Sequence, residues 1–598
     1  MEKLRKPLAF ILALIIVFSI NINITDISPE VRFISSINFG QSNSYVWIII
    51  VLFVYLISEQ SLKIKDKRLL KCSAVLAILL ATMSVIGEML NTYLDLSVVL
   101  QSNKLLLYCI IKWIGNILLL YIGTTTIFSI INNKLKENIK IKNCKFFEAK
   151  PINLFIYWGI IFIAYIPYLL AYYPGIITPD SLTQLSQTVG IYPLSNHHPI
   201  MHTFVIGIFI QLGKIFGNYN IGVAIYSIVQ MLALSGIFAY TIYYMSKKNV
   251  PILLRIITLV FYAIYPIHSM YSITMWKDIP FAICMLWFVI LINEMVTNKE
   301  QFFKSKKKLV LFAISMLLVI LFRNNGIYVV ILTAPFIFIF AKQYYKQLII
   351  IFACVLLTYS VLWKGIIFNC LKIEEGSAVE ALSVPLQQIA RVVRDKKDKL
   401  TEEEKVQINK LWEEKDLAEI YDPTLSDNVK GSVNVEELSN NKGDFIKLWL
   451  GFVIKYPMTC IEAFLCNCYG YWYPEASNWV VSRVIVEPQI EKQEELNLHQ
   501  TPLIKGKFVK EIDSYIDKRN APILSMLFSI GFAMWLVFAQ IAYIIYKKQY
   551  KLLLIFAPIL FLWLTNLASP VFCEFRYIYS LFTCLPILLF VAIPKNEN

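Results

Sequence analysis

Apolar stretches long enough to cross a bilayer recur from one end of this 598-residue chain to the other. A helix needs about 20 mostly apolar residues to span the hydrocarbon core. Hydrophobic residues make up 57% of the chain and charged residues 16%, with a mean hydropathy of +0.60. These values predict an all-α polytopic membrane protein. We expect about 14 transmembrane helices, near residues 8–24, 45–60, 70–90, 105–131, 153–173, 219–245, 250–268, 278–297, 308–322, 325–341, 346–370, 521–546, 551–567 and 575–593.

Basic residues between these stretches predict which loops are cytoplasmic, because short cytoplasmic loops are enriched in Lys and Arg. With the N-terminus inside, the major basic clusters all fall on one side. They are Lys3–Lys6, Lys63–Lys71, Lys134–Lys150, Lys247–Lys248, Lys304–Lys308 and Lys547–Lys551. This agreement requires that the apolar stretches 200–216 and 444–468 do not cross the membrane. We therefore expect both to lie as interfacial helices on the outer surface.

The same topology divides the chain into four parts. We expect an accessory N-terminal membrane module of four helices (1–150), a transmembrane module (151–371) whose first outer loop is 174–218, a mostly helical extracytoplasmic insertion (372–520), and C-terminal transmembrane helices (521–598). Within the insertion, residues 401–415 begin with a capping-box pattern and have helical periodicity.

Charge and motif content argue against several functional classes. The net charge of +15 would suit a nucleic-acid partner, but much of the excess lies in short loops, where it sets topology. No Gly-rich phosphate loop or dinucleotide-binding fingerprint is visible, so we expect neither a nucleotide cofactor nor nucleic acid. Of the eleven cysteines, only Cys460, Cys466 and Cys468 cluster; a disulfide among them stays open, and a zinc site is disfavoured because no His neighbours them.

The 30 residues from Tyr173 to His202 carry an Asp and three of the five His of the chain, but no Lys or Arg. A polar stretch without positive charge in a chain this basic is not typical of a cytoplasmic loop. Its turn residues and titratable groups predict an outward-facing active-site loop. Asp180 is its only carboxylate, and His197 and His198 precede the predicted surface helix. Alternatively, Asp180 caps a helix and the two His are solvated loop residues.

Other ionisable residues fall at the same predicted membrane face, in separate outer turns. They are Lys277 and Asp278, Arg323, and Arg576 with Tyr577. Ionisable groups at membrane depth are costly and often functional. Each also has a structural interpretation: Lys277 and Asp278 as a local ion pair, and Arg323 and Arg576 as lipid-headgroup anchors. Their convergence favours a shared substrate site.

Several strings resemble a poorly characterised bacterial family of the GT-C superfamily of membrane glycosyltransferases. They are P-G-I-I-T-P-D-S-L-T-Q, S-N-H-H-P-I-M-H-T, W-K-D-I-P-F-A, S-V-P-L-Q-Q-I-A-R, G-Y-W-Y-P-E and F-R-Y-I-Y-S. The resemblance covers roughly residues 150–593 and implies a GT-C-like fold and transfer of a sugar from a polyprenyl-phosphate donor, with inversion. Many relatives carry paired acidic residues in the first loop, whereas Asp180 stands alone beside Ser181, and this departure disfavours a metal role there.

The residue types suit this chemistry. A carboxylate such as Asp180 would act as general base on the acceptor hydroxyl. The cations would stabilise the leaving phosphate, and His197, His198, Lys277, Asp278, Arg323, Arg576 and Tyr577 are the expected substrate-binding residues. The expected partners are the lipid donor, a cell-envelope glycan or protein acceptor and membrane lipids, with a divalent cation as an option, at the outer face of a bacterial cytoplasmic membrane. The alternatives are a transporter or flippase of lipid-linked glycans, and a structural scaffold.

Overall fold

The computed structural model describes residues 2–25, 44–136, 144–413, 415–477, 481–517, 521 and 524–591. Within these residues the regular elements are helices, joined in places by isolated β-bridges, and the predicted all-α architecture is confirmed. Seven described helices are long and apolar enough to cross a membrane, or nine if two bent helix pairs each form one span. The chain is therefore a multi-pass membrane protein.

A helix is present at each of the fourteen predicted positions, but the number of spans is not confirmed. Several of these helices, such as α15 (Gly326–Phe340, 15 residues), are apolar but short. At 1.5 Å per residue, 15 residues reach only about 22 Å, less than the hydrocarbon thickness of about 30 Å. Two lysines of the predicted cytoplasmic cluster Lys134–Lys150, Lys140 and Lys142, lie outside the described residues. So do residues 592–593 of the last predicted span.

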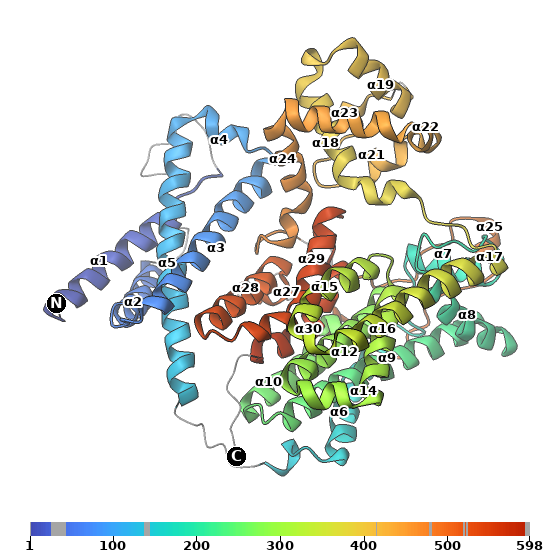
Figure 1. Ribbon diagram of the computed structural model, residues 1–598, viewed down its shortest axis with the longest axis horizontal. Coiled ribbons are helices and arrows are strands. Elements are labelled where there is room, and N and C mark those ends of the chain that lie inside the picture. The colour runs from blue at the N-terminus through green and yellow to red at the C-terminus, as the bar shows by residue number, and fades with distance from the viewer. Residues whose placement is uncertain are drawn as a thin grey trace.

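The N-terminal helices form a group to one side of the molecule (Figure 1). They are α1 (Glu2–Ile20), α2 (Ser44–Ser61), α3 (Lys67–Tyr93), the five-residue α4 (Ser97–Gln101) and α5 (Asn103–Lys136). The Asp66 side chain accepts hydrogen bonds from the Arg68 and Leu69 backbone N–H groups, which fixes the start of α3. Arg68 in turn donates to the Ile545 carbonyl at 2.6 Å, which joins the group to the C-terminal helices.

The central bundle follows in sequence. It comprises α6 (Pro151–Ala171), α7 (Pro179–Thr188), α8 (Ile200–Ile215), α9 (Tyr219–Lys247), α10 (Ile252–Ile264), α11 (Pro266–Ser272), α12 (Asp278–Thr297), α13 (Lys299–Lys304), α14 (Lys306–Phe322), α15, α16 (Tyr345–Leu357) and, after a π-helical stretch (Thr358–Ile367), α17 (Phe368–Leu371). The C-terminal helices α27 (Ser525–Phe528), α28 (Ile530–Tyr546), α29 (Ala557–Ala568) and α30 (Tyr579–Phe590) pack into it. Of all these, α12 is the most enclosed candidate span, which places it at the centre of the bundle.

Residues 378–460 build a smaller helical unit with its own apolar core at one end of the bundle (Figure 1). Its helices are α18 (Ser383–Lys396), α19 (Glu402–Trp412), α20 (Leu417–Ile420), α21 (Asp427–Ser432), α22 (Val435–Asn440) and α23 (Lys442–Lys455). The predicted capping box is confirmed: the Thr401 N–H donates to the Glu404 side chain, and the Glu404 N–H donates to the Thr401 hydroxyl. After α23 the chain bends by 105° into α24 (Pro457–Cys468). The predicted surface stretch 444–468 is thus two helices with a sharp bend.

The rest of the predicted insertion does not belong to this unit. Residues 481–504, which we term the crossing segment and which include α25 (Glu491–Glu494), run across residues 173–178 and helix α7. The Val486 N–H donates to the Ile177 carbonyl and the Thr501 N–H to the Tyr173 carbonyl, both at 2.9 Å. Helix α26 (Lys507–Asp517) then buries Ile512 and Ile516 against the bundle. The crossing segment therefore holds the loop that contains Asp180.

We predict that residues 378–460 lie outside and the Lys304 loop inside the cell, because that orientation keeps the basic clusters cytoplasmic. A membrane-impermeant maleimide should label Glu402→Cys in intact cells. It should label Lys304→Cys only after permeabilisation. Both parent side chains are exposed. The background needs Ser in place of the exposed cysteines, Cys144, Cys354 and Cys370. The reverse labelling pattern would invert the orientation, and labelling of both from one side would contradict it.

Candidate active site at the Asp180 end of the bundle

A short backbone pairing brings the first loop against the turn before α12. The Ile176 N–H donates to the Ile273 carbonyl, and the Met275 N–H donates to the Ile176 carbonyl, each at 2.9 Å. The Gln230 side-chain amide on α9 donates to the carbonyls of Tyr271, Ser272 and Thr274, which holds the same turn. Asp180 follows Ile176 by four residues, and Lys277 follows Thr274 by three. The pairing of Ile176 with Thr274 therefore places Asp180 and Lys277 side by side.

Asp180 is the centre of a cluster of charged side chains. Its Oδ2 atom lies 2.9 Å from Lys277 Nζ and 2.7 Å from Arg576 Nη1. His198 Nδ1 lies 2.9 Å from Lys277 Nζ and 3.9 Å from Asp180 Oδ2. Four of the residues that the sequence analysis selected therefore meet, from the first turn of α7, the loop before α8, the turn before α12 and the segment before α30. We call these four residues the Asp180 cluster.

The alternative interpretation of Asp180 as a helix cap does not fit the local structure. Helix α7 begins at Pro179, and its N-cap residue is Thr178. The Thr178 N–H donates to the Ser181 hydroxyl at 2.8 Å, in a capping box formed by these two residues. Asp180 lies in the first turn, and its carboxylate is directed to Lys277 and Arg576 instead.

Electrostatics set the protonation states within the Asp180 cluster. Burial alone would raise the pKa of Asp180, but Lys277 and Arg576 outweigh it and hold that pKa well below its usual range. Burial, together with neighbouring Lys277, lowers the pKa of His198 to about 2. His198 is therefore neutral at physiological pH, and its Nδ1 accepts the hydrogen bond from Lys277. The cluster consists of one carboxylate, two cations and a neutral imidazole.

Asp278 and Arg323 form a second, more deeply buried pair. Arg323 Nη1 lies 3.3 Å from Asp278 Oδ1, and their side chains are 9% and 0% exposed. Arg323 also donates to the Tyr577 carbonyl at 2.5 Å. Lys277 and Asp278, which the sequence suggested as a local ion pair, thus pair with Asp180 and Arg323 instead. Removing either partner of so buried a pair would leave an uncompensated charge, which is strongly destabilising. The pair therefore holds the start of α12 to the turn that follows α14.

Aromatic rings support both arginines. The Arg323 guanidinium lies 4.5 Å from the centre of the Tyr577 ring, and that of Arg576 lies 5.0 Å from it. Arg576 also lies 5.0 Å from the Trp276 ring. Such cation–π contacts contribute about 0.5–2 kcal/mol each. Tyr577 therefore orients the two arginines from between the two ion pairs.

Glu574 belongs to this site although the sequence analysis did not select it as a binding or catalytic residue. Its Oε1 atom lies 3.3 Å from Arg576 Nε, and its side chain is 12% exposed. Burial raises the pKa of Glu574 to about 7, and nearby Asp278 and Asp180 add to the rise while Arg576 opposes it. One arginine is thus shared by a carboxylate of low pKa and a carboxylate of raised pKa. The only sequence signal is the C-E-F-R string at the start of the last apolar stretch.

The other His residues do not complete a metal site. His197 is exposed, and its ring packs edge-on against that of His198 at 4.6 Å. His202 is buried and bonded to Gln184 and Tyr226, each at 2.8 Å. Among the described residues, no group of three or more His, Cys, Asp and Glu is placed to hold a metal ion. The eleven cysteines are all free, including Cys460, Cys466 and Cys468.

The Gly470–Pro474 segment, considered as a surface for sugar stacking, is largely buried. Tyr471, Trp472 and Tyr473 are 0%, 6% and 4% exposed. The Tyr471 hydroxyl donates to the Val571 carbonyl at 2.7 Å, and Gly470 packs on Cys573, where a Cβ would lie 2.5 Å from the Cys573 Cβ. The segment therefore supports the chain just before Glu574 and does not present its rings to a substrate at this site.

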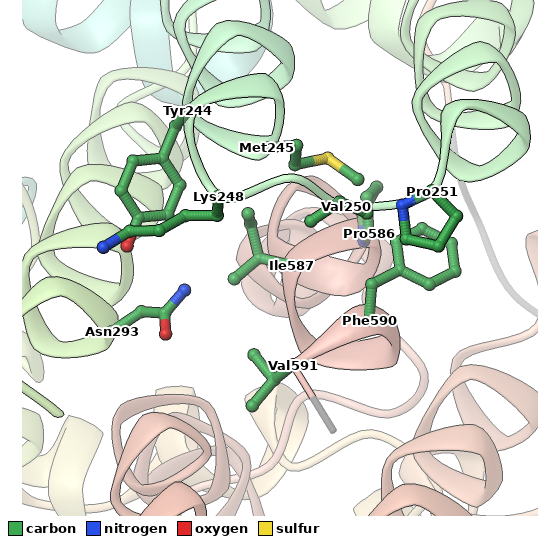
Figure 2. A pocket seen from close by; sticks show the side chains of 10 residues that line it. All are labelled: Tyr244, Met245, Lys248, Val250, Pro251, Asn293, Pro586, Ile587, Phe590 and Val591. Atoms are coloured by element: carbon green, nitrogen blue, oxygen red, sulfur yellow. The ribbon is translucent and has the colours of Figure 1, made fainter. Parts of the chain in front are cut away.

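A small cavity at the cytoplasmic-predicted end of α9 does not compete as a substrate site. Figure 2 shows Tyr244, Lys248 and Asn293 on one side of it and Ile587, Phe590 and Val591 on the other. Its volume of about 30 Å³ accommodates roughly one water molecule. Lys248 is already paired with Glu294 at 2.6 Å. This cavity is therefore too small for a sugar or lipid substrate.

Residues 190–598, more than half of the chain, match a family described as a family of unknown function (DUF6020). The match includes the turns that carry Lys277, Arg323 and Arg576, and begins ten residues after Asp180. No curated protein and no solved structure matches the chain.

We predict that Glu574→Gln stabilises the protein above pH 7. An unfolded Glu574 ionises near its ordinary value of 4.5, but the folded one ionises only near 7, so the folded state loses stability as pH rises between these values. The full penalty is about 3 kcal/mol. In thermal unfolding of the purified protein, the wild type should lose Tm from pH 5 to pH 8 relative to Glu574→Gln. Glu403→Gln, at an exposed position, is the control. A difference in Tm between the wild type and Glu574→Gln that stays constant from pH 5 to pH 8 would contradict the raised pKa.

Proposed function

We propose that this chain, which belongs to the DUF6020 family, is a GT-C-like glycosyltransferase that uses a polyprenyl-phosphate sugar. The observation that carries the proposal is the cluster of Lys277, Arg576, Asp180 and Glu574 at one end of a transmembrane bundle. A lipid that carries a phosphate places that phosphate at the end of the helices, where two cations are available. Two carboxylates with separated pKa values supply groups for proton transfer.

Phosphate binding is the first role of the cluster. In this structure Lys277 and Arg576 both contact Asp180 Oδ2. A donor phosphate would compete for the same two cations, and Arg576 would present its planar fork to two phosphate oxygens. Arg323, paired with Asp278, would hold the floor of the site. His197 and His198 lie on the loop side, where they would contact the sugar or its phosphate.

The transfer step needs a base and a charge-stabilised leaving group. The acceptor hydroxyl loses its proton to a carboxylate as its oxygen bonds to the anomeric carbon. The bond from that carbon to the phosphate oxygen breaks, and its electron pair leaves with the polyprenyl phosphate. Lys277 and Arg576 would stabilise the charge that develops there. One displacement of this kind inverts the anomeric carbon.

Two carboxylates are candidates for the base. Asp180 is the residue predicted from the sequence, but in the free site two cations make it a weak proton acceptor. Glu574, with a pKa of about 7, is better matched to general-base catalysis at neutral pH. Asp180 would regain basicity only when a phosphate draws Lys277 and Arg576 away. We favour Glu574 as the base and Asp180 as the residue that positions both cations.

The bacterial cytoplasmic membrane, with the site facing outward, is the location that best fits the proposal, since polyprenyl-phosphate sugars serve envelope assembly there.

A flippase of lipid-linked glycans is the second candidate, favoured by the helix broken between α10 and α11 with buried His268 at the break. The two differ in outcome: a transferase moves label from donor to acceptor, whereas a flippase moves intact lipid across vesicles. Envelope glycans of a deletion strain, with and without the wild-type chain, would identify the product.

We predict that Glu574→Gln lowers transfer by about 10²-fold or more and flattens the rise of rate with pH near 7, because an amide cannot accept the proton. Asp180→Asn should instead raise the apparent KM for the donor and keep the wild-type pH profile. The measurement is sugar transfer from a labelled donor by purified chain. If Asp180→Asn abolishes the rise of the transfer rate with pH, and Glu574→Gln transfers sugar at nearly the wild-type rate, Asp180 is the base.

We predict that Arg576→Lys impairs donor use although it keeps the charge. A single ammonium cannot contact Glu574, Asp180 and a phosphate in the planar geometry of the guanidinium. The expected loss in kcat/KM is roughly tenfold or more, from about 1.5–3 kcal/mol of charged hydrogen bonding. Arg394→Lys, in the 378–460 unit, is the matched control. Normal donor affinity in Arg576→Lys and Arg576→Ala would remove Arg576 from the site.

A further inference from the structure

A large cavity lies between the N-terminal helices and the bundle, apart from the Asp180 cluster. Its volume is about 770 Å³, within the range of ligand pockets. Helices α3 and α5 supply one wall, and α27, α28 and residues 473–477 supply the other. Both α3 and α5 are candidate membrane spans, so at least part of the cavity lies at membrane depth.

Contacts at both ends keep the two walls in place. At one end the Tyr473 ring packs on α3 at Gly87, where a Cβ would come within 2.3 Å of the ring. At the other end Arg68 donates to the Ile545 carbonyl, and the Tyr546 hydroxyl donates to Asp66 at 3.0 Å. The space between these contacts is therefore a built feature of the interface between the two helix groups.

The lining changes character from one part to another. Leu119, Leu120, Phe532 and Trp535 supply apolar surface from α5 and α28. Hydroxyl, amide and carboxylate groups supply the polar surface, from Ser84, Asn116, Glu475, Ser477, Ser525 and Ser529. An apolar wall at membrane depth next to a polar one matches a molecule with a hydrocarbon chain and a polar head.

The charges select the kind of head. Among the described residues that line the cavity, Glu475 is the one charged side chain, and it accepts a hydrogen bond from the Tyr473 hydroxyl at 3.1 Å. The nearby cation Lys112 is neutralised by Glu88 at 2.5 Å. Among the described lining residues, a phosphate head would meet a carboxylate and no cation, whereas hydroxyl groups can donate to Glu475 and bond to the Ser and Asn side chains.

We propose that this cavity binds an uncharged, hydroxyl-bearing membrane lipid, such as a sugar-headed diacylglycerol. The proposal needs lipid binding alone and does not rest on glycosyl transfer. The Tyr469–Pro474 segment links the two places, since Tyr473 borders the cavity and Tyr471 bonds to Val571, three residues before Glu574.

Photolabelling of the purified full chain in lipid nanodiscs tests the proposal. The probe is a monoglycosyl diacylglycerol with a diazirine in one acyl chain, compared with phosphatidic acid that carries the same chains. We expect the glycolipid probe to label peptides of α5 and α28, and Leu119→Trp to reduce this labelling about tenfold by filling the apolar part. Ile114→Trp, at a 46% exposed position of the same helix, adds equal bulk outside and should leave labelling unchanged.

Two further variants keep the result decisive. Ala476→Leu narrows the same cavity and replaces Leu119→Trp if the latter does not insert. Glu475→Ala should reduce the preference for the sugar head over phosphatidic acid, because it removes the carboxylate that accepts from hydroxyls and repels phosphate. Equal labelling of α5 and α28 by phosphatidic acid, or labelling that neither cavity-filling variant reduces, would identify only bulk lipid and overturn the proposal.

Discussion

The shared carboxylate of Asp180 is the interaction on which the charged end of this molecule depends. It joins Lys277, before α12, to Arg576, 396 residues further along the chain than Asp180. Charges this well enclosed are costly to bring out of water and are tolerated because each has a partner. Removing one partner of such a pair typically costs about 3–5 kcal/mol. The first loop, the turn before α12 and the start of the last helix are thus mutually dependent.

The arrangement explains how one arginine serves two carboxylates in different states. Arg576 directs Nη1 to Asp180 and Nε to Glu574, so the two acids lie on different edges of one planar group. Asp180 has a second cation in Lys277, whereas Glu574 has burial and two other acids as its neighbours. Their pKa values separate for that reason. A site with one ionised and one readily protonated carboxylate can bind an anion and exchange a proton within a few ångströms.

The sequence predicted the helical membrane class and the positions of the helices, because apolar stretches and caps such as Thr401 with Glu404 are local signals. It also selected four residues that meet at one point, since charge at membrane depth is rare. It did not predict which cation pairs with which acid, because this depends on the pairing of Ile176 with Thr274. Nor did it select Glu574, whose unusual protonation arises from burial. The number of spans depends on helix bends and lengths that hydropathy alone does not fix.

The distance along the chain between Asp180 and Arg576 also sets an order of assembly. A ribosome adds about 5–20 residues per second, so roughly 20–80 s separate the synthesis of the two partners. Lys277, 97 residues after Asp180, is made in the first part of that interval, whereas Glu574 and Arg576 enter the site only with the last helix. A chain that ends before the F-R-Y string leaves Asp180 with Lys277 as its partner and Glu574 without its arginine. The site is therefore complete only when the last apolar helix has been made.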